Sequence, residues 1–235
     1  MASELTKSEK LFEELCCSND IKFKRLPEGE NQQPDYLLDL NGTKVIFEIK
    51  QIEPNDYDKK FNRELSEKGT ATETRNTDKV AKRVRNAIDS ASKQIKSYIN
   101  ENGQVPAVVV IFDNAKNGYT DSYTIQTALY GWERFLISTG RDYKVVDRGF
   151  GDRNNKMLGN ERKTHISAVA SMHEYWEIEE PHERRLSLCF YHNQYAQNFF
   201  DWHLWDSEFI SHLTLEDKSP GNFQNWVSLR GLENA

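Results

Sequence analysis

The sequence has little cysteine and no long apolar run, and both shortages exclude whole classes of protein. Its three cysteines are Cys16, Cys17 and Cys189, an odd number that makes a poor disulfide framework and suits a reducing cytoplasm. No Cys-x-x-Cys pair is present, which argues against a structural zinc site. No segment approaches the ~18 apolar residues of a membrane helix, and the N-terminus lacks the apolar stretch of a secretion signal. We therefore expect a cytoplasmic protein without a membrane partner.

Positive charge is scarce in the chain as a whole but concentrated in one segment. The 235 residues carry a net charge of −6, which argues against a general nucleic-acid coat protein. Residues 59–96 hold eleven Lys and Arg against five acidic residues, so this segment is +6 and the remainder of the chain is −12. Such asymmetry is typical of proteins that bind a polyanion, although a solvated helix face would have the same composition.

Apolar periodicity predicts an α/β protein that begins with a helix at 4–17 and a strand at 21–27. Two apolar strands then flank Asn41-Gly42, a strong hairpin signal because both turn positions need positive φ. An early hairpin and a later helical crossover predict a mixed central sheet flanked by helices. The remaining pattern predicts a polar excursion at 53–76, helices at 77–101 and 124–139, a loop at 149–163, and strands at 106–114, 164–174 and 185–193.

The expected hairpin brings three charged residues to one face of strands that are otherwise apolar. With Asn41-Gly42 as a two-residue turn, Asp35 lies opposite Glu48. Lys50 lies two residues beyond Glu48 and points to the same side. Buried charges are costly unless they are paired or bind a metal. The other face is a core surface formed by Tyr36, Leu38, Leu40, Val45, Phe47 and Ile49.

The two opposed carboxylates admit two interpretations. They repel each other unless one is protonated or a cation lies between them. Oxygen ligands at this spacing suit a hard cation such as Mg²⁺ or Mn²⁺, and a lysine beside the metal can orient or deprotonate an attacking water. In the second interpretation, Lys50 and Glu48 form a satisfied ion pair at the end of a sheet, without chemistry.

These residues also resemble a known family. Pro34-Asp35, twelve residues, and then Glu48-Ile49-Lys50 resemble the motif of the PD-(D/E)xK nuclease superfamily, whose shared core is the restriction-endonuclease-like fold. The expected order of helix, strand, hairpin, basic helix and buried strand is similar to that core. The resemblance covers residues 4–114. Residues 115–235 are then expected as a C-terminal α+β extension, packed on the core in a single domain, 1–235.

The resemblance implies a metal site and an accessory residue. Asp35, Glu48 and the backbone carbonyl of Ile49 would hold Mg²⁺ or Mn²⁺, and Lys50 would position the water. Many relatives add an acid from the leading helix, and Glu9 lies nearest the buried edge of that helix. A further polar residue often follows on the basic helix, where Gln94 is the candidate. The alternatives are an ordinary boundary acid for Glu9, and Arg85 or Ser92 in place of Gln94.

The function that follows is hydrolysis of phosphodiester bonds by a metal-dependent nuclease. Nucleic acid is the expected partner, with DNA favoured over RNA. The alternative is a catalytically silent binding module for nucleic acid or protein, in which the triad is a salt-bridge network. The aromatic segment 190–209 is expected to be core, although stacking of nucleic-acid bases or an oligomer or protein contact would also use it. The expected phosphate contacts are Lys79, Lys82, Arg83, Arg85 and Lys93.

Overall fold

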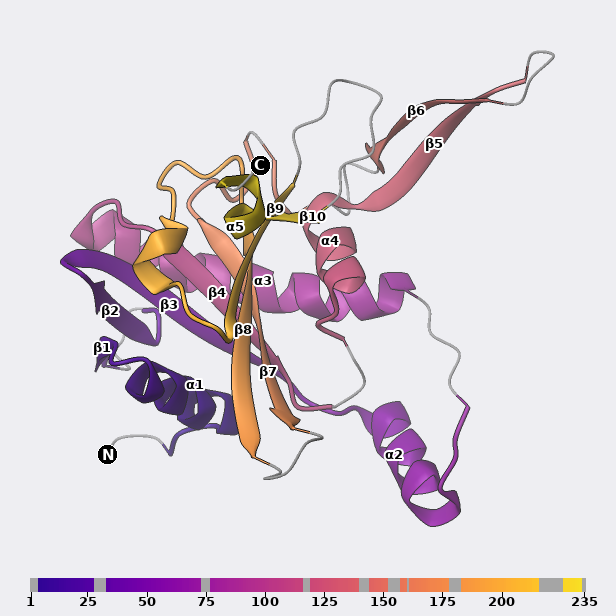
Figure 1. The fold of residues 1–235 in the computed structure, drawn as a ribbon, viewed down its shortest axis with the longest axis horizontal. Helices are drawn as coiled ribbons and strands as arrows, with labels where there is room; N and C mark the ends of the chain where they lie inside the picture. The colour runs from indigo at the N-terminus through magenta and orange to yellow at the C-terminus, as the bar shows by residue number, and fades with distance from the viewer. Residues whose placement is uncertain are drawn as a thin grey trace.

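A mixed sheet of eight strands forms the centre of the fold, and helices lie on both of its faces (Figure 1). The computed structural model describes residues 4–27, 33–72, 77–115, 119–139, 144–151, 157–159, 161–177, 183–215 and 226–233. This arrangement confirms the expected α/β class with a mixed sheet and flanking helices.

Apart from α2, the helices and strands follow one another in the order expected for the first half of the chain. They are α1 (Lys7–Ser18), β1 (Lys22–Arg25), β2 (Tyr36–Leu40), β3 (Thr43–Ile52), α2 (Asp56–Lys68), α3 (Thr77–Asn102), β4 (Ala107–Asp113) and α4 (Ser122–Tyr130). The second half contains β5 (Trp132–Ser138), β6 (Lys144–Gly151), β7 (Ala168–Trp176), β8 (Arg184–His192), the 3-10 helix η1 (Trp202–Trp205), β9 (Ile210–Leu215), β10 (Trp226–Ser228) and α5 (Leu229–Glu233).

The sheet combines antiparallel hairpins with parallel crossovers. Its strand order is β1-β2-β3-β4-β7-β8-β9-β10, with β3, β4 and β7 parallel to one another and β2 antiparallel to β3. The parallel pair of β3 and β4 needs a long connection, which α2 and α3 supply. Strands β7 to β10, from the expected C-terminal extension, continue the same sheet. A separate two-stranded hairpin, β5 with β6, projects from the body (Figure 1).

The β2–β3 hairpin has the predicted turn and register. Asn41 has a φ of 55° and Gly42 a φ of 89°, the left-handed conformation that both turn positions require. Leu40 pairs with Thr43, and Tyr36 pairs with Phe47. The open end of the hairpin therefore brings residues 35 and 48 next to each other.

Each face of the sheet has its own apolar core. On one face, α1 packs against the predicted core surface of the hairpin, and Phe190, Phe200 and Trp205 join that cluster. On the other face, α3 and α4 cover the sheet, and the predicted stripe of α3 is buried. The aromatic segment 190–209 is thus mainly core, although Phe199 is exposed. The α3 stripe consists of Val80, Val84, Ile88, Ala91, Ile95 and Ile99.

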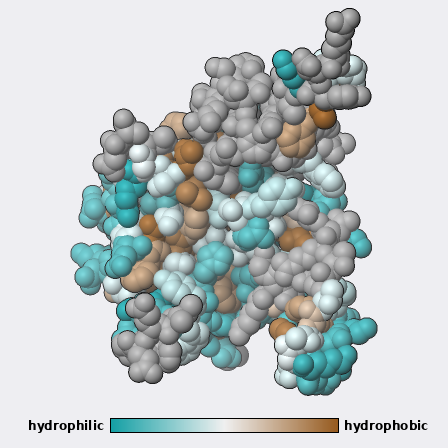
Figure 2. All heavy atoms as spheres, turned by 45° about the vertical axis from the view of Figure 1, so that its right-hand side comes forward, coloured by the Kyte–Doolittle hydropathy of each residue, from teal (hydrophilic) through white to brown (hydrophobic). Residues whose placement is uncertain are grey.

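The outer surface is mainly polar. Figure 2 shows hydrophobic residues scattered among hydrophilic ones on the face in view, in keeping with a mean hydropathy of −0.80. Among the described helices, none combines the length and the apolar character that a membrane crossing needs.

The prediction of an irregular excursion at 53–76 was wrong, because α2 occupies most of its first part. Asn55 caps the helix in a capping box: its side chain accepts from the backbone N–H of Asp58, and the Asp58 side chain accepts from the backbone N–H of Asn55. Gly69 ends the helix in the left-handed conformation with a φ of 72°. The sequence of α2 lacks an apolar stripe because the helix lies mostly in solvent, so few of its positions need to be apolar. Residues 73–76 lie outside the described residues.

The predicted helix at 124–139 ends early. Gly131 has a φ of 88°, which stops α4 at Tyr130. The next residues, rich in aromatic and branched side chains, form β5 instead. Strand β6 pairs with β5 and includes residues 149–151 of the predicted loop, so this part of the loop prediction was also wrong. Residues 152–156 and 160 lie outside the described residues.

Asp58 anchors α2 to the rest of the protein. Its side chain is fully buried and accepts hydrogen bonds from the hydroxyl of Tyr119 and, at 2.7 Å, from Nη1 of Arg83. Arg83 also donates to the carbonyl of Glu53 and lies 4.5 Å from the centre of the Tyr119 ring. Burial by itself raises the pKa of Asp58, but the hydrogen bonds from Tyr119 and Arg83 outweigh it and lower that pKa.

We expect Tyr119→Phe to lower the free energy of unfolding by about 1–2 kcal/mol, because it removes one hydrogen bond to a buried carboxylate. Urea denaturation measures the change. Tyr57→Phe is the matched control, since Tyr57 lies on α2 but is exposed and should leave stability unchanged. Equal stability of Tyr119→Phe and wild type would contradict the anchoring role of this cluster.

Candidate active site

The carboxylates of Asp35 and Glu48 lie at the open end of the β2–β3 hairpin, where each accepts a hydrogen bond from a backbone N–H. The backbone N–H of Asp35 donates to Oε2 of Glu48 at 3.1 Å. In return, the backbone N–H of Ile49 donates to Oδ2 of Asp35 at 2.7 Å. Each side chain thus accepts a hydrogen bond from the opposite strand, and the two strands hold the carboxylates in fixed positions.

Lys50 completes the cluster and links it to α3. Its Nζ lies 2.5 Å from Oε1 of Glu48 and donates to Oε1 of Gln94 at 2.8 Å. The side-chain amide of Gln94 also donates to the carbonyl of Gln33 at 3.2 Å. Gln94 therefore bridges the lysine on β3 and the backbone just before Asp35. The structure brings together four of the predicted site residues: Asp35, Glu48, Lys50 and Gln94.

The cluster carries more negative charge than Lys50 can neutralise. Glu48 is fully buried, and burial followed by the charge of Asp35 raises its pKa from 4.5 to about 8, against the opposing effect of Lys50. Burial also raises the pKa of Asp35, although the N–H of Ile49 and the charge of Lys50 oppose the shift. A further cation or a bound proton would therefore stabilise the pair.

The donor set of the cluster fits a hard divalent cation. Oε1 of Glu48 is buried, accepts no hydrogen bond from a described backbone group, and lies 2.5 Å from the ammonium of Lys50. Within the described ranges, no three His, Cys, Asp or Glu side chains form a group that could hold a metal. Two carboxylates would thus need a backbone carbonyl, such as that of Ile49, and water. Mg²⁺ is commonly bound by one or two carboxylates with several waters.

Glu9 serves the start of α1 in this structure. Its Oε2 accepts from the backbone N–H of Thr6 at 2.7 Å and from the hydroxyl of Thr6 at 2.6 Å, which completes a capping box. Its Oε1 pairs with Arg25 at 3.3 Å. The charge of Glu9 contributes to the raised pKa of Asp35, but its oxygens already have partners. A metal-ligand role for Glu9 stays a prediction.

The five basic residues predicted to contact phosphate divide into two groups. Arg83 is held in the Asp58 cluster, and Arg85 is nearly buried and paired with Asp78 at 2.7 Å. These two side chains have carboxylate partners that link α3 to its surroundings, and a phosphate contact by either of them stays a prediction. The other three are exposed on α3: Lys79, Lys82 and Lys93.

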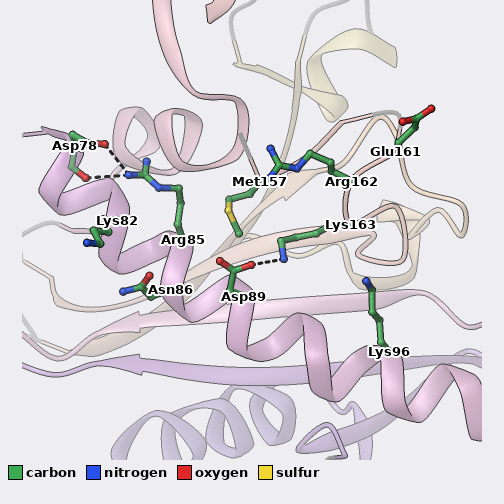
Figure 3. Close-up of a pocket in the computed structure, with 10 residues that line it drawn as sticks. All are labelled: Asp78, Lys82, Arg85, Asn86, Asp89, Lys96, Met157, Glu161, Arg162 and Lys163. Carbon is green, nitrogen blue, oxygen red and sulfur yellow. Dashed lines mark hydrogen bonds and ion pairs between the residues drawn. The ribbon is translucent and has the colours of Figure 1, made fainter. Parts of the chain in front are cut away.

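Two features were not predicted from the sequence: the start of α2, and the position of Arg162 and Lys163 beside α3. Asn55 followed three residues later by Asp58 is a capping-box pattern that could have revealed α2. Arg162 and Lys163 lie beside α3 in space (Figure 3). Their separation from α3 in the chain left no signal of this proximity.

Comparison with models of known protein families, with curated proteins and with solved structures found no match to this chain. A functional conclusion therefore depends on the geometry of the cluster.

We expect Glu48→Gln to gain stability over wild type as the pH rises from 5 to 8 in the absence of divalent metal. The raised pKa of Glu48 contributes stability that is fully present below the unfolded value near 4.5. That contribution is lost as the pH rises through the folded value, since the native state must give up a proton it holds more tightly than the unfolded state. The difference in unfolding free energy should grow by roughly 3.5 kcal/mol.

Chemical denaturation at several pH values in EDTA measures this difference. Glu67→Gln is the control, because Glu67 is exposed on α2 and should show no such trend. A constant difference between Glu48→Gln and wild type would show that Glu48 does not retain its proton.

Proposed function

We propose that the protein is a metal-dependent nuclease that hydrolyses phosphodiester bonds of nucleic acid, with DNA as the favoured substrate. The observation that supports this most directly is the convergence of Asp35, Glu48 and Lys50 at the end of one hairpin, with both carboxylates short of positive charge. Charged groups are rarely buried in this way without a functional or structural reason.

The topology around the cluster supports membership of the PD-(D/E)xK superfamily as part of the same proposal. Helix α1, strands β1 to β3, the long helix α3 and the buried strand β4 follow in the order of a restriction-endonuclease-like core. The motif residues lie at the end of β2 and on β3, in the centre of that arrangement.

Asp35, Glu48 and the carbonyl of Ile49 would hold the metal in this proposal. Bound Mg²⁺ or Mn²⁺ supplies charge that stabilises the phosphate oxygens and lowers the pKa of water. The carboxylates are preorganised for this role, because backbone N–H groups fix one oxygen of each. Oε1 of Glu48 accepts no hydrogen bond from a described backbone group and lies 2.5 Å from the ammonium of Lys50, so a bound cation would take the place of that contact.

Lys50 would hold the attacking water through its ammonium group. Its side chain is 22% exposed, whereas that of Glu48 is fully buried, so the ammonium lies between the carboxylate and the surface. Gln94 accepts a hydrogen bond from it at 2.8 Å and acts as a positioning residue. When the carboxylates bind a cation, Lys50 no longer has to neutralise Glu48 and becomes available to the water.

The substrate would approach over α3. The exposed side chains of Lys79, Lys82 and Lys93 lie on its outer surface, where they can contact phosphates without reading bases. Binding of this kind weakens steeply with salt, because each phosphate contact releases counterions.

One observation favours the alternative of a catalytically silent module. The direct contact of 2.5 Å between Lys50 and Glu48 is the contact that a structural salt-bridge network would have. A network of this kind has no use for a divalent metal, so metal binding separates the two functions.

We expect Mg²⁺ or Mn²⁺ to raise the melting temperature of the wild type and to leave that of Glu48→Gln unchanged, because a ligand that binds only the native state stabilises it. At a free metal concentration of 100 times Kd, the gain is about 2.7 kcal/mol. Differential scanning fluorimetry with added metal or EDTA gives the measurement. A metal response of equal size in both proteins would place the ion elsewhere.

We expect the wild type to cleave nucleic acid in Mg²⁺ or Mn²⁺, and Lys50→Ala to lose at least about 100-fold in rate, in the range for loss of a proton-transfer group. The assay offers plasmid, linear duplex, single-stranded DNA and RNA. Lys44→Ala is the matched control, since Lys44 is an exposed lysine on the same strand and should cleave like wild type.

Cleavage that survives in Lys50→Ala would reject this site as its source. Binding of oligonucleotides without cleavage or metal stabilisation would favour the silent module.

A further inference from the structure

A charged cavity lies on the other flank of α3, away from the candidate active site. It has a volume of about 560 Å³ and is formed by one side of α3 together with Met157 and residues 161–163 (Figure 3). None of Asp35, Glu48, Lys50 and Gln94 lines it. Its lining residues are Asp78, Lys82, Arg85, Asn86, Asp89, Lys96, Met157, Glu161, Arg162 and Lys163.

The lining has an excess of positive charge. Five cationic side chains face three acidic ones, and two of the acids are already paired, Asp78 with Arg85 and Asp89 with Lys163. The third acid, Glu161, points away from the helix (Figure 3). Lys82 and Lys96 form no ion pair with a described residue. The cavity therefore keeps a net attraction for anions.

Arg85 has a buried guanidinium nitrogen that is suited to donate to an anion. Arg85 is only 8% exposed, and its Nη2 donates to the carboxylate of Asp78 at 2.7 Å. Its Nη1 is buried, and within the described part of the chain it has no hydrogen-bond partner. Leaving a buried charged donor without a partner is costly, and a phosphate oxygen is a natural acceptor for an arginine N–H.

The neighbouring His165 lies in the field of two of the same lysines. His165 is nearly buried beside Ser92 of α3, with 2.9 Å between its Nε2 and the serine hydroxyl. Burial, followed by the positive charges of Lys96 and Lys163, lowers the pKa of His165 to about 4.

The two sites occupy opposite flanks of the same helix. Arg85 and Gln94 are nine residues apart, which places them on opposite sides of α3 and about 13 Å apart along its axis. Lys79 and Lys93 are exposed on α3, at angular positions between these two flanks. A chain of phosphates could thus run from the active site across α3 to the cavity.

We infer that this cavity is a phosphate-binding subsite, which holds a backbone phosphate of the nucleic acid at a distance from the bond that is cleaved. The inference rests on the proposed function and extends it, since it places the expected phosphate contact of Arg85 in the cavity and adds Arg162 and Lys163 to the substrate surface. The same chemistry would accept a free phosphate or the phosphate of a nucleotide, so the source of the phosphate has to be tested together with the site.

The test uses the double variant Lys82→Gln/Arg162→Gln. Both side chains are exposed, and their removal keeps the Arg85–Asp78 pair, so the fold should be retained. Lys44→Gln is the matched control for loss of a surface charge. The first measurement is the melting temperature in potassium phosphate and in potassium chloride of equal ionic strength. Phosphate should stabilise the wild type and the control, and this gain should be lost in the double variant.

The second measurement is the affinity for labelled single-stranded and duplex oligonucleotides, by fluorescence anisotropy in EDTA over a range of salt concentrations. We expect the double variant to bind about tenfold more weakly. The slope of log K against log salt should also fall by about 2, one for each cation removed. The control should keep the affinity and slope of the wild type.

An equal response of the wild type and the double variant to phosphate would overturn the subsite. A loss of the phosphate response with unchanged oligonucleotide affinity and salt slope would overturn the assignment to the nucleic-acid backbone, and would identify a free phosphate or nucleotide as the ligand. Metal-dependent cleavage with no effect of the double variant would leave the nuclease standing and reject the cavity. Loss of both phosphate and oligonucleotide binding in a protein that never cleaves would support the cavity and reject the nuclease.

Discussion

The hydrogen bonds that hold the carboxylates of Asp35 and Glu48, donated by the backbone N–H groups of Ile49 and Asp35, are the constraint on which the candidate site depends. Each carboxylate is held by a backbone N–H of the opposite strand, so their positions are fixed by the hairpin register. That register follows from Asn41-Gly42, because both residues take the left-handed conformation of a two-residue turn. A local turn thus determines where two charges meet at the far end of the hairpin, and a slip of one residue would separate them.

Helix α3 connects the cluster on the hairpin to the rest of the protein. Its buried stripe packs on the sheet and leaves two polar flanks. One flank carries Gln94, which accepts from Lys50. The other carries Arg85 and the cationic cavity. Because one rigid helix supports both flanks, the distance between the active site and the proposed phosphate subsite is set by residue spacing along α3.

The arginines and the lysines of α3 lie in different environments. Arg83 and Arg85 have the carboxylate partners Asp58 and Asp78. Lys79, Lys82 and Lys93 are exposed side chains on α3. Arginine suits the buried positions because its planar group donates several hydrogen bonds at fixed angles. A count of positive residues in 59–96 therefore overstates the surface that a polyanion could contact. The exposed lysines and the cavity form the smaller surface that is available.

The sequence by itself determined the elements whose signals are local: the Asn-Gly hairpin, its register, the apolar stripe of α3 and the buried strand β4. It therefore also determined that Asp35, Glu48 and Lys50 share one face. It did not reveal α2, whose capping signal lacked an apolar stripe, or the end of α4 at Gly131. Only the tertiary structure decided that Arg83 would anchor α2 and that Met157 and residues 161–163 would form a cavity with α3. Such contacts join distant parts of the chain, and they depend on packing that no local pattern encodes.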